Sequence, residues 1–464
     1  MALLCLQAAC FIVLQIPSVQ TYIGKKAVDS VSDKINGEIS IGKIYLVFFN
    51  RVIVNDIAIV STEKSPLLDS LKANYGQSDT LLYCKKLSVT LKPVELLKFK
   101  LKLNTISLSG GEFNLQTEKE KYTNLDRIFR LSKDAPKDTT RKGSPELLAN
   151  ALRIEDFRFT LNNPERAQSR GDSIINFSNL NVSDIFVNIS DVHLKSDTIY
   201  ASINNISGKD KSGFALKGLN GKARVSGTEV LVNDLYMADK YSQLNSKYFY
   251  MKYSSPKDFS DFINKVDLGL NLNGAYLNFR TIGKMAPALE KSTMAFNLNG
   301  LIEGKVKDLK SRNLLVTSVS GHTFADMDIR LDGLPDITRT MAVVDINRSS
   351  TDFRDVSKII ASVNGTPVNK FIKGLSPGTN YSFKGSLTGL LDDFVIKGDI
   401  DSPLGNVFLD VLFRNERNLG ASFNGEVIAS NLDAGAILCN DILGKADFAI
   451  KSDVLFKKGG GVEV

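Results

Sequence analysis

The stretch 381–413, which reads YSFKGSLTGLLDDFVIKGDIDSPLGNVFLDVLF, constrains the fold of this chain more than any other. Its apolar residues recur at every second position, which is the period of a β-strand and not of a helix. Glycines fill further positions of the same phase, and glycine inside a strand marks a bulge, a bend or a close backbone approach. The stretch therefore predicts paired strands in a sheet that bends around its apolar face.

The same pattern occurs earlier in the chain, at 296–316, which reads FNLNGLIEGKVKDLKSRNLLV. The two stretches align without a gap, and Gly300 matches Gly385 at an offset of 85 residues. A weaker third copy, SFNGEVIASNLD, begins at Ser422. Repeated strand pairs that stack on their neighbours predict a mainly β, elongated and curved repetitive sheet with an open, taco-like groove.

Composition limits the classes of protein that this chain can belong to. With 464 residues and 43% hydrophobic content, it can bury a large core and is not a disordered protein. The net charge of +7 is spread over the chain without a long run of either sign, which argues against a nucleic-acid partner. Its four cysteines form neither a disulfide framework nor a CxxC metal site. They are Cys5, Cys10, Cys84 and Cys439.

The N-terminal segment 1–16 contains the uncharged run ALLCLQAACFIVLQI. As a helix this run would reach only about 22 Å, short of the roughly 30 Å hydrocarbon core of a bilayer, and no basic residue precedes it. Three interpretations stay open: a signal anchor whose true start lies upstream, a cleaved signal peptide, and a buried core helix. We expect a transmembrane or signal-anchor segment. Its apolar residues are Leu3, Leu4, Leu6, Phe11, Ile12, Val13, Leu14 and Ile16.

The next part of the chain, 17–131, has the pattern of a mixed α+β region. The spacing in 17–36 predicts an amphipathic helix, which could lie on a membrane surface or cap a sheet, and we adopt the capping interpretation. Alternation then predicts strands within 39–60, 80–91 and 101–115, a turn or helix at 93–99, and a short helix at 122–131.

A polar segment at 132–146, broken by two prolines, predicts a linker or mobile loop. Residues 147–464 then read as strand after strand, which predicts a repetitive β-groove region. Short helices are expected at 281–291, 353–363 and 432–443, where the apolar spacing lengthens. Such helices could close a sheet end or cover an open edge.

Several phrases in this order resemble a known family. They are IPSVQTYIGKKAVDSVSDKINGEISIGKIYLVFFNRVIVNDIAIVS, SDTLLYCKKLSVTL, FKLKLNTISLSGGEFNL, the stretch that opens at Tyr381, and LDAGAILCNDILGKADFAI. Together they resemble the N-terminal portion of the TamB and AsmA-like envelope proteins of the Bacteroidetes type. Two features depart from that family: the anchor lacks a basic flank, and the chain stops after KKGGGVEV without the family's C-terminal domain. From both features we expect a fragment or an incomplete reading frame, truncated at its C-terminus.

The resemblance implies a bacterial inner-membrane protein with a single N-terminal anchor and its bulk in the periplasm. It implies that an apolar groove moves phospholipid, or another acyl-chain lipid, between the inner and outer membranes. The alternative that it implies is an assembly scaffold for outer-membrane or secreted proteins, which pairs strands with an outer-membrane barrel protein.

No residue pattern in the chain predicts catalysis, a metal site or a cofactor. His193 and His322 are isolated, and the Asp392–Asp393 pair is more readily explained by turn chemistry, because Asp308 occupies the equivalent place in the earlier repeat. The glycine pairs have no following GK[ST], so they are not phosphate loops. We therefore expect that the protein is not an enzyme.

The remaining functional candidate is the apolar phase of the repeated strands. In an ordinary domain such a face packs on a second layer, but the helices here are few and short, which favours an open face that holds acyl chains. The candidate lipid-lining residues of the groove are Phe296, Leu298, Ile302, Val306, Phe383, Leu387, Phe394, Ile396 and Ile400.

Overall fold

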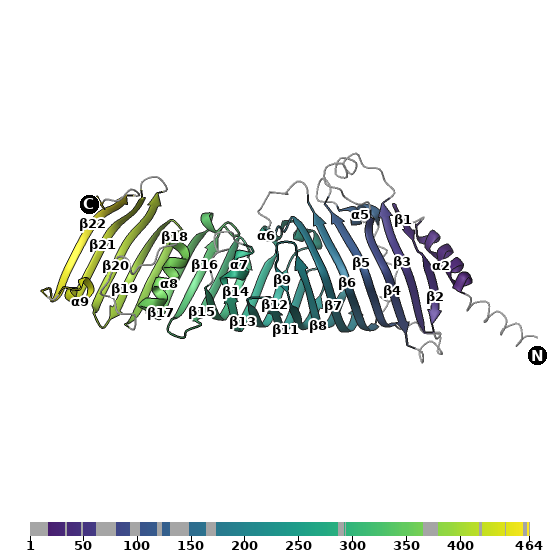
Figure 1. The fold of residues 1–464 in the computed structure, drawn as a ribbon, viewed down its shortest axis with the longest axis horizontal. Coiled ribbons are helices and arrows are strands. Elements are labelled where there is room, and N and C mark those ends of the chain that lie inside the picture. The colour runs from purple at the N-terminus through teal and green to yellow at the C-terminus, as the bar shows by residue number, and fades with distance from the viewer. Residues whose placement is uncertain are drawn as a thin grey trace, which may run out of the picture. The chain divides into compact units, whose positions relative to one another are not determined.

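The computed structural model describes residues 17–32, 35–47, 50–61, 80–92, 103–117, 123–129, 148–163, 173–285, 292, 294–364, 379–416, 420–440, 442–457 and 462–463. The described chain is mainly β with a few short helices, as the sequence predicts (Figure 1). The expected anchor at 1–16 lies outside the described residues. Within the described part, no helix combines the length and the apolar character needed to cross a bilayer.

The chain divides into two units. Unit 1 comprises Met1–Gly227 and Met237–Lys240, and unit 2 comprises Thr228–Tyr236 and Tyr241–Val464. In unit 1, β3 pairs with β4, β4 with β5, and β6 with β7, all antiparallel, whereas β5 and β6 are parallel. The strands of unit 1 are β1 (Gly37–Ser40), β2 (Lys43–Val47), β3 (Arg51–Ser61), β4 (Thr80–Leu91), β5 (Leu103–Gln116), β6 (Leu148–Asn162), β7 (Asn179–Lys195), β8 (Thr198–Asp210), β9 (Ala215–Leu216) and β10 (Gly218–Val225).

The linker or loop expected at 132–146 belongs to unit 1, and β5 and β6 on either side of it are neighbours in one sheet. Parallel neighbours need a crossover connection, which a polar loop with an adjoining helix can supply. Part of that connection is α5 (Asn124–Ile128), inside the helix expected at 122–131, and Ile128 is fully buried. The segments 93–99 and 132–146 themselves lie outside the described residues.

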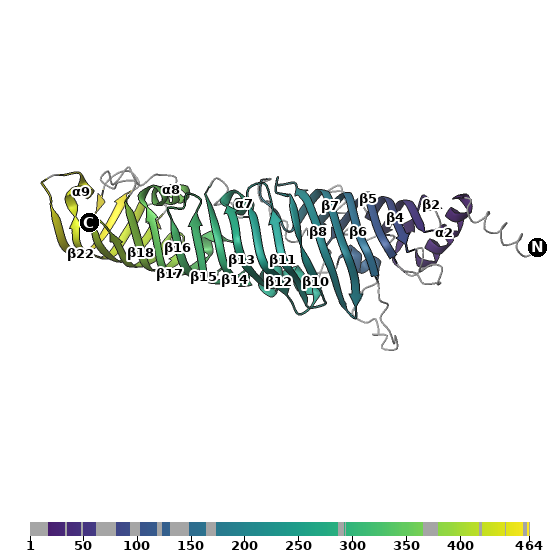
Figure 2. The ribbon, with the colours of Figure 1, turned by 90° about the horizontal axis from the view of Figure 1, so that it is seen from below.

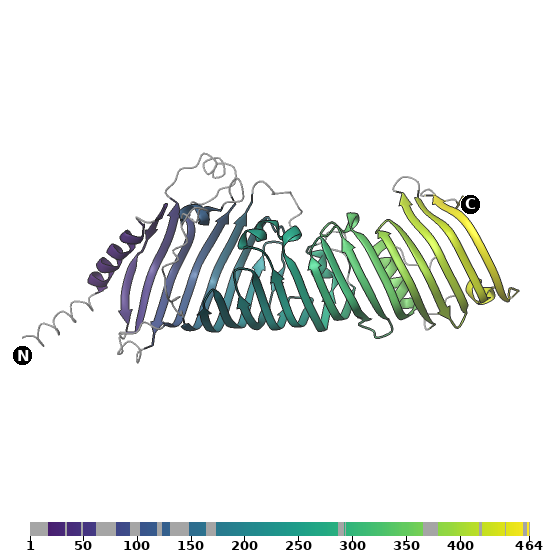
Figure 3. The same ribbon diagram turned by 180° about the vertical axis from the view of Figure 1, so that it is seen from behind.

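Helix α2 (Pro17–Ser32) covers an edge of the unit 1 sheet, as expected from its spacing (Figure 3). The Thr21 hydroxyl donates to the Ile44 carbonyl at 3.0 Å and accepts from the Ile44 N–H at 3.1 Å. The Gln20 side-chain oxygen accepts from the Leu46 N–H at 2.8 Å. These bonds satisfy backbone groups of β2 that an uncovered edge would offer to another strand.

In unit 2 the strands follow one another through the sheet in sequence order, from β12 to β23, and every neighbouring pair is antiparallel. The strands are β11 (Glu229–Ala238, shared between the units), β12 (Gln243–Lys252), β13 (Asp267–Asn278), β14 (Ala295–Lys305), β15 (Asp308–Ser318), β16 (Phe324–Asp332), β17 (Met341–Asp352), β18 (Asn380–Leu390), β19 (Asp393–Ser402), β20 (Gly405–Glu416), β21 (Gly420–Asp433), β22 (Lys445–Lys457) and β23 (Val462–Glu463).

Short helices interrupt unit 2 at each of the three places that the sequence indicates. They are α7 (Phe279–Gly283), α8 (Phe353–Asn364) and α9 (Ala434–Leu438), and a further short helix, α6 (Phe262–Lys265), precedes β13. Helices α7, α8 and α9 follow β13, β17 and β21, so one helix occurs after every fourth strand. All three lie along one margin of the sheet (Figure 2).

Bulges at Asp and Asn bend the strands in addition to the glycines that the sequence singles out. Asn313 has a φ of 52° and Asn431 a φ of 53°, and the pairing register shifts at both. The freed N–H of each donates to a carboxylate on the next strand, Asp328 at 2.7 Å and Asp447 at 2.5 Å. Asp and Asn tolerate this left-handed backbone conformation better than most residues.

Candidate functional site

The strand register places the expected lining residues of β18 and β19 on one face of the unit 2 sheet. Phe383 lies directly opposite Ile400, and Leu387 lies directly opposite Ile396. Residues that face each other across an antiparallel pair project to the same side. We call this side the apolar face and the other side the polar face.

The lining residues expected on β14 share this face. Ile302 connects to Leu387 through a row of directly paired residues, one on each intervening strand. The row runs through Ser311, Ile329 and Val344. Phe296 and Leu298 also lie on β14, an even number of residues from Ile302. Val306 differs from the expectation, because it occupies the two-residue turn between β14 and β15 rather than a strand position.

Strands β18 to β21, between α8 and α9, carry the most regular part of the apolar face, which we call the apolar bay. Four rows of directly paired residues cross these four strands, and none of their side chains is ionisable or hydrogen-bonding. The rows are Gly389, Phe394, Phe413 and Phe423; Leu387, Ile396, Val411 and Gly425; Gly385, Gly398, Leu409 and Val427; and Phe383, Ile400, Val407 and Ala429.

The polar face of the same strands carries the charged groups. Lys397 pairs with Asp410 at 2.8 Å, and Arg414 pairs with Asp393 at 3.2 Å. Asp308, at the equivalent repeat position, pairs with Arg330 at 3.3 Å. The repeated Asp therefore makes a cross-strand ion pair at the beginning of its strand.

Solvent reaches much of the apolar face. Phe423 is 38% exposed, and Ile450 and Phe456, which continue the face on β22, are 51% and 46% exposed. Most bay side chains are half-buried. A face closed by a second layer would bury large apolar side chains almost completely, so the part formed by β20 to β22 is open.

A row of phenylalanines crosses the bay near one end of its strands. The ring centroids of Phe394 and Phe413 are 4.9 Å apart, those of Phe413 and Phe423 are 5.2 Å apart, and those of Phe423 and Phe456 are 5.8 Å apart. Sequence reasoning identified only Phe394. The others become evident once the pairing register is known, because each lies directly or diagonally opposite its neighbour.

Two glycines leave room for the Phe383 ring beside them. Gly385 and Gly398 are direct cross-strand partners. A Cβ atom added to Gly398 would lie 2.6 Å from the Gly385 Cα and 2.9 Å from the Phe383 Cε2, closer than packed atoms approach. The ring therefore occupies the space that a side chain at Gly398 would need.

Helices α7 and α8 each begin over the apolar face with the same arrangement, which sequence reasoning missed. In α7 an Asn278 cap is followed by Phe279, whose ring lies 5.6 Å from that of Phe296. In α8 Asp352 precedes Phe353, which is only 7% exposed, and the Asp352 carboxylate accepts from the Asp355 N–H at 2.8 Å. The visible signal is the pair of phrases NFRT and DFRD at the two strand ends.

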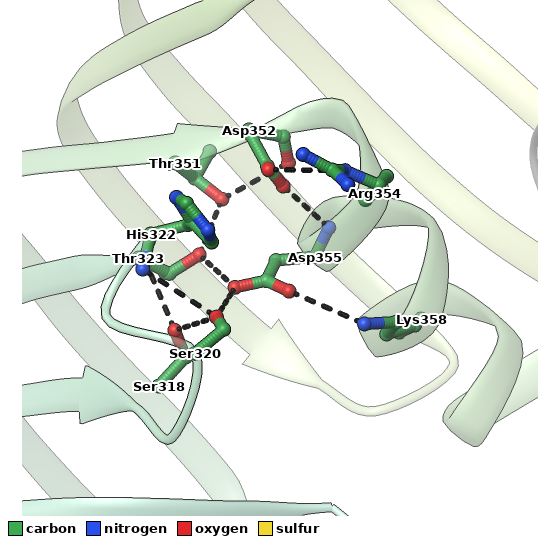
Figure 4. A network of polar contacts seen from close by, with 9 residues as sticks. All are labelled: Ser318, Ser320, His322, Thr323, Thr351, Asp352, Arg354, Asp355 and Lys358. Carbon is green, nitrogen blue, oxygen red and sulfur yellow. Dashed lines mark hydrogen bonds and ion pairs between the residues drawn. The ribbon is translucent and has the colours of Figure 1, made fainter. Parts of the chain in front are cut away.

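Asp355 attaches the first turn of α8 to the β15–β16 turn (Figure 4). Its carboxylate accepts from the Ser320 hydroxyl at 2.7 Å and from the Thr323 hydroxyl at 2.9 Å. The Thr323 and Thr351 hydroxyl oxygens are 2.8 Å apart. Thr351 lies opposite Tyr381. The attachment therefore joins three strand ends to the helix.

The electrostatics of Asp355 favour its charged form. Burial raises the pKa of this carboxyl, but the hydrogen bonds from Ser320, Ser318 and Thr323 and the positive charge of Lys358 lower it more, so the pKa lies below the usual value. Lys358 approaches the carboxylate at 3.7 Å. The other titratable side chains around it are Asp352, Arg354 and His322 (Figure 4).

The isolated candidate ligands remain separate in the structure. The His193 ring stacks on Tyr200 at 5.0 Å. Among the residues that the structure describes, no three His, Cys, Asp or Glu side chains form a group that could hold a metal ion. Cys84 is a buried free thiol and Cys439 an exposed one.

Comparison of the chain with protein-family models, with curated proteins and with solved structures finds no match.

Proposed function

We propose that unit 2 binds the hydrocarbon chains of lipids on its apolar face. The observation that carries this proposal is the apolar bay: four rows across four strands without one ionisable or hydrogen-bonding side chain, with Phe423 still 38% exposed.

The chemistry of the bay fits hydrocarbon better than it fits another protein surface. Protein interfaces are only about 56–65% apolar and carry hydrogen bonds throughout. Lipid tails, in contrast, are as apolar as leucine. A face made only of Phe, Leu, Ile, Val, Ala and Gly residues can contact an acyl chain over its whole surface. Its side chains form no hydrogen bond with a polar group of a partner.

Passive holding of a lipid tail needs no headgroup site. Each methylene removed from water contributes about 0.8 kcal/mol, so a chain that covers a few rows of the bay is retained without a specific polar contact. Such binding would be tolerant of lipid species.

In the wider proposal, the repetitive sheet curves into an elongated apolar groove that moves phospholipid between inner and outer membrane. The protein is then anchored in the bacterial inner membrane by its N-terminal segment, with its bulk in the periplasm. The resemblance of the sequence to TamB and AsmA-like envelope proteins supports this part, and the repeated strands of unit 2 supply its apolar rows.

Photo-crosslinking in cells tests the proposal. A photoreactive residue replaces Phe383 in one strain and Lys384, its neighbour on the polar face, in another, and the adducts are identified by mass spectrometry. Phospholipid attached at Phe383 and absent at Lys384 supports hydrocarbon binding. Protein adducts alone at both sites would contradict it and show that the apolar face meets another polypeptide.

A second candidate function is pairing with strands of an outer-membrane barrel protein. In the described part of the chain, β22 pairs on its outer side only through Leu455 and Phe456, with β23. An added strand would pair along the rest of this side of β22, where no described strand lies. A photoreactive residue at Asp453 that forms barrel-protein adducts, with no lipid captured at Phe383, would favour this function.

A further inference from the structure

We propose that α8 is a cover held in place by the hydrogen bonds around Asp355, which we call the latch. It closes its part of the apolar face and so separates the apolar bay from the face on β13 to β16. This inference rests on the hydrocarbon binding proposed above. A bound acyl chain would then occupy one bay at a time instead of lying anywhere along a continuous strip.

The latch lies on the apolar face itself. Ser318 lies opposite Phe296, and Thr351 lies opposite Tyr381, so both hydroxyl residues belong to that face. They are among the few polar side chains there, and both belong to the cluster around Asp355 (Figure 4). Hydroxyl groups on an apolar surface are costly unless they find hydrogen-bond partners. Ser318 and Thr351 find them in the hydroxyls of Ser320 and Thr323, which donate in turn to the Asp355 carboxylate at the start of α8.

The same device occurs four strands earlier, at the start of α7. There the Ser242 hydroxyl accepts from the Asn278 N–H at 2.9 Å, and its oxygen lies 2.6 Å from the Thr281 hydroxyl oxygen. Thr281 is three residues after its cap, as Asp355 is three residues after Asp352. In both cases a hydroxyl group from an earlier strand–strand connection, β11–β12 or β15–β16, is hydrogen-bonded to the start of a helix.

The bay between α8 and α9 has the size of one lipid chain. Adjacent strands are about 4.8 Å apart, so β18 to β21 span roughly 15 Å between their axes. One acyl chain is about 15 Å long, because two leaflets make up the roughly 30 Å hydrocarbon core. Across its strands the bay therefore has the length of one acyl chain.

The latch differs from core packing in one useful way. Asp355 holds its partners through hydrogen bonds and an ion pair with Lys358, each of which can be removed by a small substitution that leaves the sheet register untouched. Removing two such bonds should raise the opened population of α8 by at least about tenfold.

The experiment places a photoreactive residue at Leu409, inside the bay, or at Tyr381, beside the start of α8, in the purified full chain. Each is illuminated with phosphatidylcholine vesicles, in the wild-type background and with Asp355→Asn combined with Ser320→Ala. We expect lipid adducts at Leu409 in both backgrounds, and at Tyr381 an increase of about tenfold when the latch is removed. Hydrogen exchange of α8 reports the opening, and that of β18 to β21 shows that the sheet is intact.

Asp345→Asn is the matched control, because Asp345 lies opposite Ser386 on the polar face of β17, the strand that leads into α8. It should leave the adducts at Tyr381 at the wild-type level. If Tyr381 captures lipid as well as Leu409 does in the wild type, or captures none although α8 has opened, the cover is refuted while hydrocarbon binding stands. If neither site captures lipid in either background, the proposed function itself fails. Should the double variant lose its sheet, Ser320→Ala alone gives the same comparison.

Discussion

Replacing Phe423 with alanine tests whether the apolar face is as open as its exposure indicates. Phe353, at the start of α8, is 7% exposed, and a buried Phe→Ala change costs about 3–5 kcal/mol because it leaves a cavity. Phe423 is 38% exposed, so water fills the space that its ring leaves and no closed cavity forms. Full burial of a Phe is worth about 1.5–3 kcal/mol, and this ring is only partly covered.

The edge contacts of Phe423 with Phe413 and Phe456 add about 0.5–1.5 kcal/mol. We therefore expect Phe423→Ala to cost about 2 kcal/mol and Phe353→Ala about 4 kcal/mol. Hydrogen exchange detected by mass spectrometry measures both as local opening. Exchange should accelerate about 30-fold in β20 and β21 for the first variant, and on the order of 10³-fold in α8 for the second. Equal acceleration in the two variants would show that the face is covered.

Three further predictions concern backbone space, edge protection and pH. Gly398→Ala should destabilise unit 2 by about 2 kcal/mol through overpacking. Gly444→Ala should change its stability little, because no atom lies within 4 Å of the added Cβ. Equal urea unfolding midpoints for the two variants would contradict this prediction. Thr21→Val should speed exchange of the Ile44 amide about tenfold by removing its side-chain partner, and an unchanged rate would mean that α2 does not protect the edge. The pKa of Asp355 lies below its usual value of 3.8, so the stability that its hydrogen bonds give is present above pH 3.8 and is lost as the pH falls through the lowered pKa. Protection of the α8 amides from hydrogen exchange, corrected for intrinsic rates, should therefore fall only below pH 3.8. In Asp355→Asn this pH dependence should be absent.

The alternation of apolar residues was sufficient to predict the strands and their shared face. The stretch 381–413 became β18, β19 and β20, and Leu387 and Ile396 face each other as their phase predicts. This succeeded because side-chain direction in a strand depends only on local parity. The same local rule placed Val306 on a strand, although it lies in a tight turn.

The bulges and the latch could not be derived from local parity. Asn313 and Asn431 each add a residue that reverses the phase of the strand residues after it, and only the pairing register reveals this reversal. Asp355 meets Ser320 across 35 residues of sequence, at a distance that depends on three strands being in register. The weak third copy of the repeat, at Ser422, belongs to β21, which precedes a helix. The other two copies begin in β14 and β18, and each of these strands follows a helix.

Binding of lipid by two neighbouring aspartate variants tests the central claim most directly. Ile396→Asp places a charge in the apolar bay, and Val395→Asp places the same charge on the polar face, where Val395 is 39% exposed. The purified full-length variants, with folding verified by circular dichroism, are mixed with phosphatidylcholine vesicles and analysed by native mass spectrometry for retained lipid. We predict that Val395→Asp retains as much lipid as the wild type and that Ile396→Asp retains less. Equal retention by both variants, or none by the wild type, would contradict hydrocarbon binding on the apolar face.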